Sequence, residues 1–225
     1  MIQVHGFQKL TLLDYPGRLA CTIFLGRCNF RCPFCHNAGL VLAPEQEPTV
    51  PMEEIMETLR KRRGILDGVC ITGGEPTVSR ELPEIVKEIK KLGYAVKLDT
   101  NGTNPGMVKT MVEKGLLDYV AMDIKNSPEK YRETAGVENI NLEAVCETVE
   151  FLKSGKTEYE FRTTVTRELL KIRKWISGSR RYFLQAYQES EQVIRPIYSS
   201  YSKEQLENFR QLLLEEIEQV ELRGV

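Results

Sequence analysis

Histidine is scarce in this chain, whose 225 residues include only His5 and His36. This scarcity excludes a zinc site with three histidine ligands and disfavours a Ser-His-Asp triad. The chain also lacks an excess of one charge, because 31 Lys and Arg stand against 32 Asp and Glu. Without surplus basic residues there is no electrostatic case for general nucleic-acid binding.

Long hydrophobic runs are missing as well. The longest stretch without an acidic or basic residue begins at Cys32 and ends at Pro44, too short for a bilayer and interrupted by Pro33 and His36. The N-terminal segment lacks the apolar core of a secretory signal, and six cysteines are too sparse for a disulfide scaffold. We therefore expect a cytoplasmic protein that binds neither membrane nor nucleic acid.

The composition is that of a globular chain, 41% hydrophobic and 28% charged, and its length suits one domain spanning residues 1–225. Six runs rich in Val, Ile, Phe and Tyr predict β-strands. These runs are Leu19–Leu25, Val69–Thr72, Tyr94–Leu98, Tyr119–Met122, Tyr159–Val165 and Tyr182–Leu184. Charged amphipathic segments between them predict helices at Met52–Arg63, Glu81–Leu92, Met107–Lys114, Leu142–Lys153 and Glu168–Trp175. The alternation favours parallel βαβ units, an α/β fold that would form an incomplete (β/α)6 barrel.

A further helix is predicted near the C-terminus. Ser202 and Gln205 fit a capping box at its start. Helical spacing then continues through Leu206, Phe209, Leu213, Ile217 and Val220. We expect this helix to pack on the outside of the fold.

Three cysteines follow the first predicted strand at the spacing C-x3-C-x2-C: Cys28, Cys32 and Cys35. Structural zinc usually takes four ligands from two separate pairs, and this segment offers only His36 as a fourth. A four-iron cluster held by three cysteines instead leaves one iron open to a substrate. The other cysteines, Cys21, Cys70 and Cys146, are isolated in apolar surroundings and are expected in the core.

With Phe34 at the aromatic position of C-x3-C-x-aromatic-C, this motif resembles that of the radical S-adenosylmethionine (SAM) superfamily. The segment GFQKLTLLDYPGRLACTIFLGRCNFRCPFCHN, from Gly6 to Asn37, is similar to the glycyl-radical-enzyme activases. It is closest to the activating proteins of anaerobic ribonucleoside-triphosphate reductases. The resemblance implies a radical SAM barrel, a [4Fe-4S] cluster on the three cysteines, and SAM bound at the open iron.

The same resemblance implies a reaction and its partners. Reductive cleavage of SAM would give a 5′-deoxyadenosyl radical, which removes a Cα hydrogen from a glycine of a large glycyl radical enzyme. The electron would come from a flavodoxin or ferredoxin, because the chain has no second cysteine cluster.

Polar motifs follow the second and third predicted strands. In ITGGEPT the paired glycines let a ligand approach the backbone, and the resemblance implies that SAM's amino group binds at Thr72, Gly73, Gly74 and Glu75. In KLDTNGT, the resemblance assigns Asp99, Thr100 and Asn101 to the same SAM pocket.

The fourth predicted strand ends in MDIK. Asp123 there lies on the strand adjacent to Asp99, and two such carboxylates can share a hard cation. The resemblance to pyruvate formate-lyase activases implies a cation site made of Asp99, Thr100, Ala121 and Asp123. It also implies that Lys125 neutralises the SAM carboxylate or contacts ribose.

The fifth predicted strand, FRTTVT, places Phe161, Thr163 and Val165 on one face and Arg162 and Thr164 on the other. An inward-facing Arg162 is costly without an anionic partner, for which the resemblance offers the SAM carboxylate. Thr164 is assigned to the same pocket. At the end of the sixth strand, Gln185 and Tyr187 lie where some relatives have a histidine near the adenosyl group, and Tyr187 is taken as the cofactor-binding residue.

These signals all follow the carboxyl ends of successive predicted strands, where α/β barrels carry their active sites. Three alternatives stay open. The chain could activate pyruvate formate-lyase or another glycyl radical enzyme, or it could be a radical SAM enzyme acting on a small molecule. It could also be a zinc-binding adaptor without catalytic activity.

Overall fold

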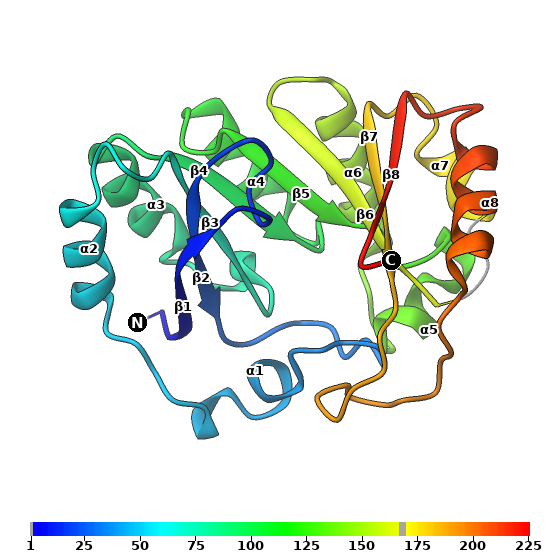
Figure 1. Ribbon diagram of the computed structural model, residues 1–225, viewed down its shortest axis with the longest axis horizontal. Coiled ribbons are helices and arrows are strands. Elements are labelled where there is room, and N and C mark those ends of the chain that lie inside the picture. The colour runs from blue at the N-terminus through cyan, green and yellow to red at the C-terminus, as the bar shows by residue number, and fades with distance from the viewer. Residues whose placement is uncertain (1, 167–169) are drawn as a thin grey trace.

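The computed structural model describes residues 2–166 and 170–225. Its centre is one curved sheet of eight strands that follow chain order from edge to edge (Figure 1). The strands are β1 (Val4–Thr11), β2 (Ala20–Leu25), β3 (Gly68–Gly73), β4 (Ala95–Thr100), β5 (Tyr119–Asp123), β6 (Glu158–Val165), β7 (Arg181–Ala186) and β8 (Gln219–Arg223). The first pair, β1 and β2, is antiparallel, and every later pair is parallel.

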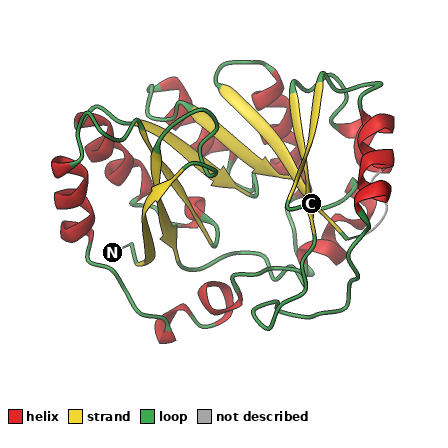
Figure 2. Ribbon diagram, viewed as in Figure 1, coloured by secondary structure: helices red, strands yellow, loops and turns green. Residues whose placement is uncertain are grey.

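Most of the helices lie around the outside of this sheet, whereas α1 and α5 lie near the carboxyl ends of its parallel strands (Figures 1 and 2). The helices are α1 (Ala38–Leu42), α2 (Met52–Lys61), α3 (Leu82–Lys91), α4 (Pro105–Glu113), α5 (Tyr131–Ala135), α6 (Leu142–Lys153), α7 (Leu170–Trp175) and α8 (Lys203–Leu213). In the described residues, no helix has both the length and the apolar character needed to cross a membrane.

The two faces of the sheet differ in chemistry because successive side chains of a strand point to opposite sides. Side chains such as Val69 and Leu98 are fully buried in one apolar core with residues of the surrounding helices. Lys97, next to Leu98 on β4, and Glu160 on β6 are also buried, but they are charged. The inner face of the sheet is therefore a polar wall, and it leads toward the carboxyl ends of the parallel strands.

The six predicted strands are confirmed as β2 to β7, with ends shifted by one or two residues. The predicted helix at Glu168–Trp175 is described from Leu170 onward, and Glu168 lies outside the described residues. Side chains of β6 alternate as expected: Phe161, Thr163 and Val165 are buried, and Arg162 and Thr164 face the inner side.

Two edge strands, β1 and β8, were not predicted. In β1 only the first and last residues are buried, and in β8 only Val220 is, so neither shows a buried run. The predicted C-terminal helix was too long: its capping box on Ser202 and Gln205 is present, but α8 ends at Leu213 and Val220 lies in β8. Within the described part of the sheet, β1 and β8 remain unpaired edges, so the barrel is open on one side.

Candidate functional site

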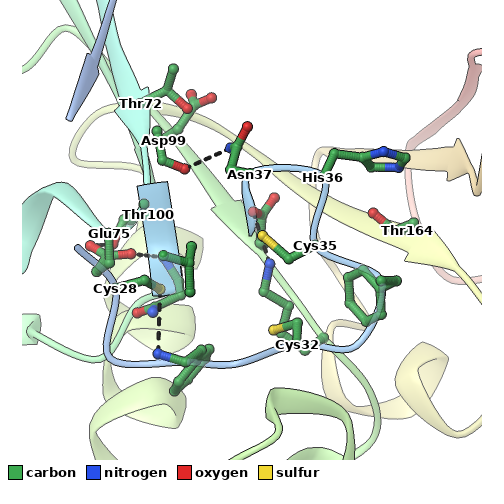
Figure 3. Close-up of a pocket in the computed structure, with 18 of the residues that line it drawn as sticks. Cys28, Cys32, Cys35, His36, Asn37, Thr72, Glu75, Asp99, Thr100 and Thr164 are labelled. Atoms are coloured by element: carbon green, nitrogen blue, oxygen red, sulfur yellow. Dashed lines mark hydrogen bonds and ion pairs between the residues drawn. The ribbon is translucent and has the colours of Figure 1, made fainter. Parts of the chain in front are cut away.

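A pocket lies at the carboxyl ends of the parallel strands, between the segment after β2 and the strand ends (Figure 3). Nearly all predicted site residues line it: Cys28, Cys32, Phe34, Cys35, Thr72, Gly73, Gly74, Glu75, Asp99, Thr100, Asn101, Asp123, Lys125, Arg162 and Thr164. Residues that are 136 positions apart in the chain thus share one cavity, because parallel strands end at the same edge of a sheet.

The cysteines lie on a loop that the rest of the chain holds from two sides. The amide of Arg31 donates to Ala135 O at 2.8 Å, at the end of α5. From the C-terminal half, the amides of Ile194 and Arg195 donate to Cys35 O and Pro33 O at 3.2 and 2.8 Å. These backbone contacts fix the loop, so the directions of its thiols are set by the fold.

Burial favours the protonated thiols of Cys28 and Cys32 in the absence of a metal. Desolvation raises the pKa of Cys28 to about 12 and that of Cys32 to about 11. A thiol that coordinates a metal is deprotonated by the metal's own charge. The loop therefore presents one buried and two half-buried thiols that become strong ligands when a metal cluster is bound.

The paired glycines of the β3 turn are required by close backbone packing. Gly73 has φ +115°, and a Cβ atom there would lie 2.3 Å from Leu25 O. A Cβ atom on Gly74 would lie 1.9 Å from Arg27 O, directly before the cysteine loop. Asn37, after the loop, donates from Nδ2 to Gly73 O at 2.8 Å. The turn and the cysteine loop are thus built as one unit.

Glu75 connects this turn to the end of β4. It is 1% exposed, and its carboxylate accepts from the Thr77 amide at 3.0 Å and from Thr100 Oγ1 at 2.8 Å. It also accepts from the Thr77 hydroxyl at 2.5 Å and from the Asn101 amide at 2.6 Å. Burial raises the pKa of Glu75 even though these donors lower it. The side chain assigned to SAM from the sequence is therefore engaged with the protein itself.

Replacing Glu75 by Gln should destabilise the protein, because an amide nitrogen would then face backbone donors. A buried donor left without a partner costs about 1–3 kcal/mol, and we expect a loss of unfolding free energy in that range, measured by urea denaturation. Glu84→Gln, at an exposed position on α3, is the control and should change little. A Glu75→Gln protein as stable as its parent would contradict this role.

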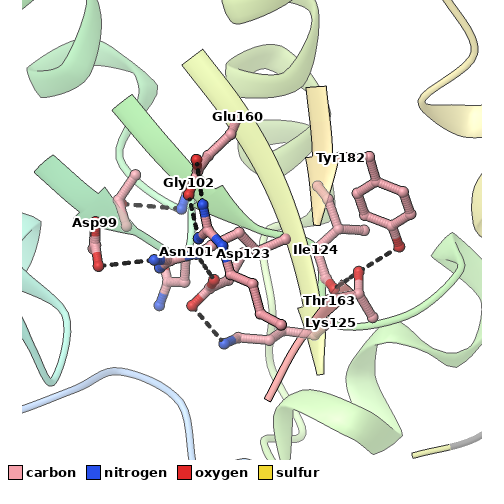
Figure 4. A network of polar contacts seen from close by, with 12 residues as sticks. Asp99, Asn101, Gly102, Asp123, Ile124, Lys125, Glu160, Thr163 and Tyr182 are labelled. Atoms are coloured by element: carbon pink, nitrogen blue, oxygen red, sulfur yellow. Dashed lines mark hydrogen bonds and ion pairs between the residues drawn. The ribbon is translucent and has the colours of Figure 1, made fainter. Parts of the chain in front are cut away.

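A network of charged side chains forms the inner wall of the pocket (Figure 4). Arg162 lies between two carboxylates: its Nη1 is 2.9 Å from Asp99 Oδ2, and its Nε is 2.8 Å from Asp123 Oδ1. Lys97 also pairs with Asp99, and Lys125 Nζ lies 3.1 Å from Asp123 Oδ2. Within this network three cations face two carboxylates, whereas the pocket lining itself combines Lys125 and Arg162 with the carboxyl groups of Asp99, Asp123 and Glu75.

The electrostatic effects of this network are large. Burial would raise the pKa of Asp99, but Arg162 and Lys97 lower it to about 2. Burial would lower the pKa of Lys125, but Asp123 and the nearby cysteines raise it. The sequence assigned Asp99 and Asp123 to a metal cation and Arg162 to the SAM carboxylate, whereas in the structure these three side chains pair with one another. A metal cation at Asp99 and Asp123 stays a prediction.

Two predicted residues lie away from the pocket lining. Ala121 is buried in a small cluster with Tyr15 and Tyr119 and does not line the pocket. Tyr187 is 1% exposed and packs near His36 and Tyr198, with ring centroids 6.1 and 6.3 Å apart. Gln185, two residues earlier, lines the pocket in its place.

The pocket also contains residues that were not assigned to SAM from the sequence: Phe30, His36, Asn37 and Val41. Their only sequence signal is that they lie within or directly after the cysteine motif. Among the described residues, no group of three or more His, Cys, Asp or Glu side chains could hold a single metal ion. If His36 completed a zinc site with the three loop cysteines, all four ligand atoms would have to lie about 2.0–2.3 Å from one point.

Comparison with known proteins places this pocket in a family. Residues 22–170 match the Radical SAM superfamily. The chain belongs to that superfamily. The matched residues contain all three pocket cysteines, the glycine turn and the charged network, so the family match and the pocket coincide.

Relatives are named for related activities. A Methanocaldococcus jannaschii protein named as a glycyl-radical enzyme activating enzyme is 34% identical over 165 residues, covering 72% of this chain and 67% of its own length. A pyruvate formate-lyase-activating enzyme of Clostridium pasteurianum is 30% identical over 132 residues, covering 56% of this chain and 53% of its own. Streptococcus suis SuiB bound to S-adenosylmethionine has the same fold, with a TM-score of 0.69 and 13% identity over 88% of this chain and 48% of SuiB.

Membership of the radical SAM superfamily implies a [4Fe-4S] cluster and SAM, and the residues of the pocket fit both. The three thiols are free and share one cavity, as three cluster ligands require. Lys125 and Arg162, two cations that line the cavity, can offset the charge of thiolates and of a bound carboxylate.

Proposed function

We propose that this radical SAM protein activates a glycyl radical enzyme, namely an anaerobic ribonucleoside-triphosphate reductase. The observation that carries the proposal is a cysteine pocket at the carboxyl ends of a sheet whose two edge strands do not close a barrel in the described residues. A large partner can insert a loop there, because the pocket is not sealed by paired strands. The relative named as a glycyl-radical enzyme activating enzyme and the similarity of Gly6–Asn37 to reductase activators support the choice of partner.

The chemistry follows from this assignment. When bound, the reduced cluster supplies the electron that splits SAM into methionine and a 5′-deoxyadenosyl radical, which removes the Cα hydrogen of the partner's glycine. Cys28, Cys32 and Cys35 hold the cluster and leave one iron for SAM. The chain's other residues position the substrate and keep water and stray hydrogen donors away from the radical.

Each SAM contact is assigned to a wall of the pocket. Thr72, Gly73 and Gly74 bind the amino group through the β3 turn, whose shape Glu75 maintains. Lys125 and the free N–H groups of Arg162 neutralise the carboxylate. Asn101 and Thr164 face the adenosine, and Phe34 lies beside the cluster. Tyr187 packs behind the residues that line the pocket. The electron comes from a donor such as a flavodoxin or ferredoxin.

The test is to reduce the loaded protein anaerobically with SAM and one of two partners. With an anaerobic ribonucleotide reductase we expect a glycyl radical, seen as a doublet in the electron paramagnetic resonance spectrum. A radical only on pyruvate formate-lyase would favour the second candidate, which the Clostridium pasteurianum relative supports. SAM cleavage that radicalises neither partner would favour a small-molecule substrate and overturn the proposal.

A further inference from the structure

On the inner face of the sheet, outside the pocket lining, the last strand contributes an ion pair with a buried carboxylate that the proposed chemistry leaves unused. Glu160 on β6 is fully buried (Figure 4). Its Oε1 accepts from Arg223 Nη1 at 2.9 Å, and its Oε2 accepts from Arg223 Nη2 at 3.1 Å. The Tyr119 hydroxyl also donates to Oε2, at 2.9 Å. A bidentate pair of this kind fixes the orientation of the guanidinium.

The register of the sheet places Arg223 at the open side of the barrel. Arg223 pairs with Gln185 across β7 and β8, and Gln185 lines the pocket. From there its side chain extends toward Glu160, and its guanidinium carbon lies 3.5 Å from the centroid of the Phe183 ring. Since β8 is an edge strand, Arg223 forms the inner wall where the sheet stops.

This guanidinium has N–H donors that the ion pair with Glu160 does not use. Arginine carries five N–H donors, and the bidentate contact with Glu160 uses two of them. The side chain of Arg223 is 30% exposed, so it is partly accessible to solvent. Glu160 balances the charge of the guanidinium, and Phe183 covers one face of it. The guanidinium therefore suits a neutral acceptor better than a phosphate or carboxylate.

A peptide carbonyl oxygen is such an acceptor. A loop inserted beside the pocket loses water from its backbone, and each buried C=O group then needs a donor. We propose that Arg223, oriented by Glu160 and Phe183, binds a backbone carbonyl of the glycine-bearing loop of the partner enzyme. The inference rests on the proposed activase function and makes Arg223 a residue that selects a peptide substrate.

The test uses Arg223→Lys, which keeps the charge beside Glu160 but removes the planar fork of donors. The partner concentration that gives half-maximal glycyl radical formation on the reductase should rise about tenfold to a hundredfold, the loss expected for a hydrogen bond to a charged group. SAM cleavage without the partner should stay at the parent rate, because no SAM contact is changed.

Two further variants separate recognition from folding. Arg210→Lys is the matched control, because Arg210 Nε donates to Val220 O and so contacts β8 from the opposite side. It should leave the partner requirement unchanged. The double variant Arg223→Met with Glu160→Met removes both charges of the pair together, so that no unpaired carboxylate stays buried, and should show the same partner defect as Arg223→Lys.

The outcomes distinguish the two proposals. If the parent protein forms the radical and Arg223→Lys forms it at the same partner concentration, the role of Arg223 is overturned and the activase function stands. If Arg223→Lys also loses SAM cleavage without the partner, Arg223 acts on the SAM pocket and the inference fails. If the parent cleaves SAM but radicalises neither glycyl radical enzyme, the activase proposal itself fails and the inference falls with it.

Discussion

Replacement of Cys28, Cys32 or Cys35 by alanine is expected to abolish both the iron–sulfur cluster and SAM cleavage. Each thiol lines the same pocket, and a four-iron cluster with three protein ligands has no spare ligand to lose. Iron content after anaerobic reconstitution and the broad visible absorbance of the cluster measure the first loss. Formation of methionine and 5′-deoxyadenosine measures the second. A parent protein that binds zinc and stays colourless would contradict the cluster assignment.

The other three cysteines provide matched controls. Cys21 is fully buried in the apolar core, and Cys146 lies on α6, so their replacement by alanine should leave iron content near that of the parent. Cys70 is also fully buried, but its Sγ lies 3.8 Å from both Lys97 Nζ and Asp99 Oδ1, so the expected apolar surroundings were wrong for this residue. Loss of iron in any of these variants would show that the ligands were wrongly assigned.

The parallel strands could be predicted because their signal is local. Runs such as Val69–Thr72 and Tyr119–Met122 combine β-branched or aromatic residues with flanking turns, and burial in a sheet covered by helices requires that pattern. The edge strands have no such signal. In β8 one buried residue, Val220, was assigned to the helical spacing of α8, because periodicity alone cannot show where a helix ends.

The location of the site could also be predicted, since the carboxyl ends of parallel strands bring distant motifs together without any knowledge of side-chain contacts. The pairing inside the site could not. That Arg162 lies between Asp99 and Asp123 depends on the register between β4, β5 and β6, and register is a tertiary property. Likewise, the sequence motif predicts that Glu75 binds a ligand. In the structure, Thr100 and Asn101 at the end of β4 donate to its two carboxylate oxygens.

The charged network predicts a second large effect, in the variant Arg162→Met. The side chain of Arg162 is 11% exposed and that of Asp99 is 13% exposed, so loss of the guanidinium leaves two carboxylates with too few partners in a poorly hydrated site. Removing one partner of a buried ion pair typically costs about 3–5 kcal/mol, and we expect a decrease of that size in the free energy of unfolding. SAM affinity should be lost as well, because Asp99, Asp123 and Lys125 would rearrange at the pocket wall.

The matched control is Arg173→Met. Arg173 also lies between two carboxylates, with 2.9 Å to Glu215 and 2.8 Å to Glu216, but these partners are 61% and 27% exposed. Solvent screens such a pair, and its loss should cost about 0–1 kcal/mol and leave SAM affinity unchanged. Urea denaturation of the metal-free proteins and SAM titration of the reconstituted proteins compare the two variants. If Arg162→Met unfolded at the same urea concentration as Arg173→Met, burial would not determine how much the charged network contributes to the free energy of unfolding. Arg162 would then act only on SAM binding.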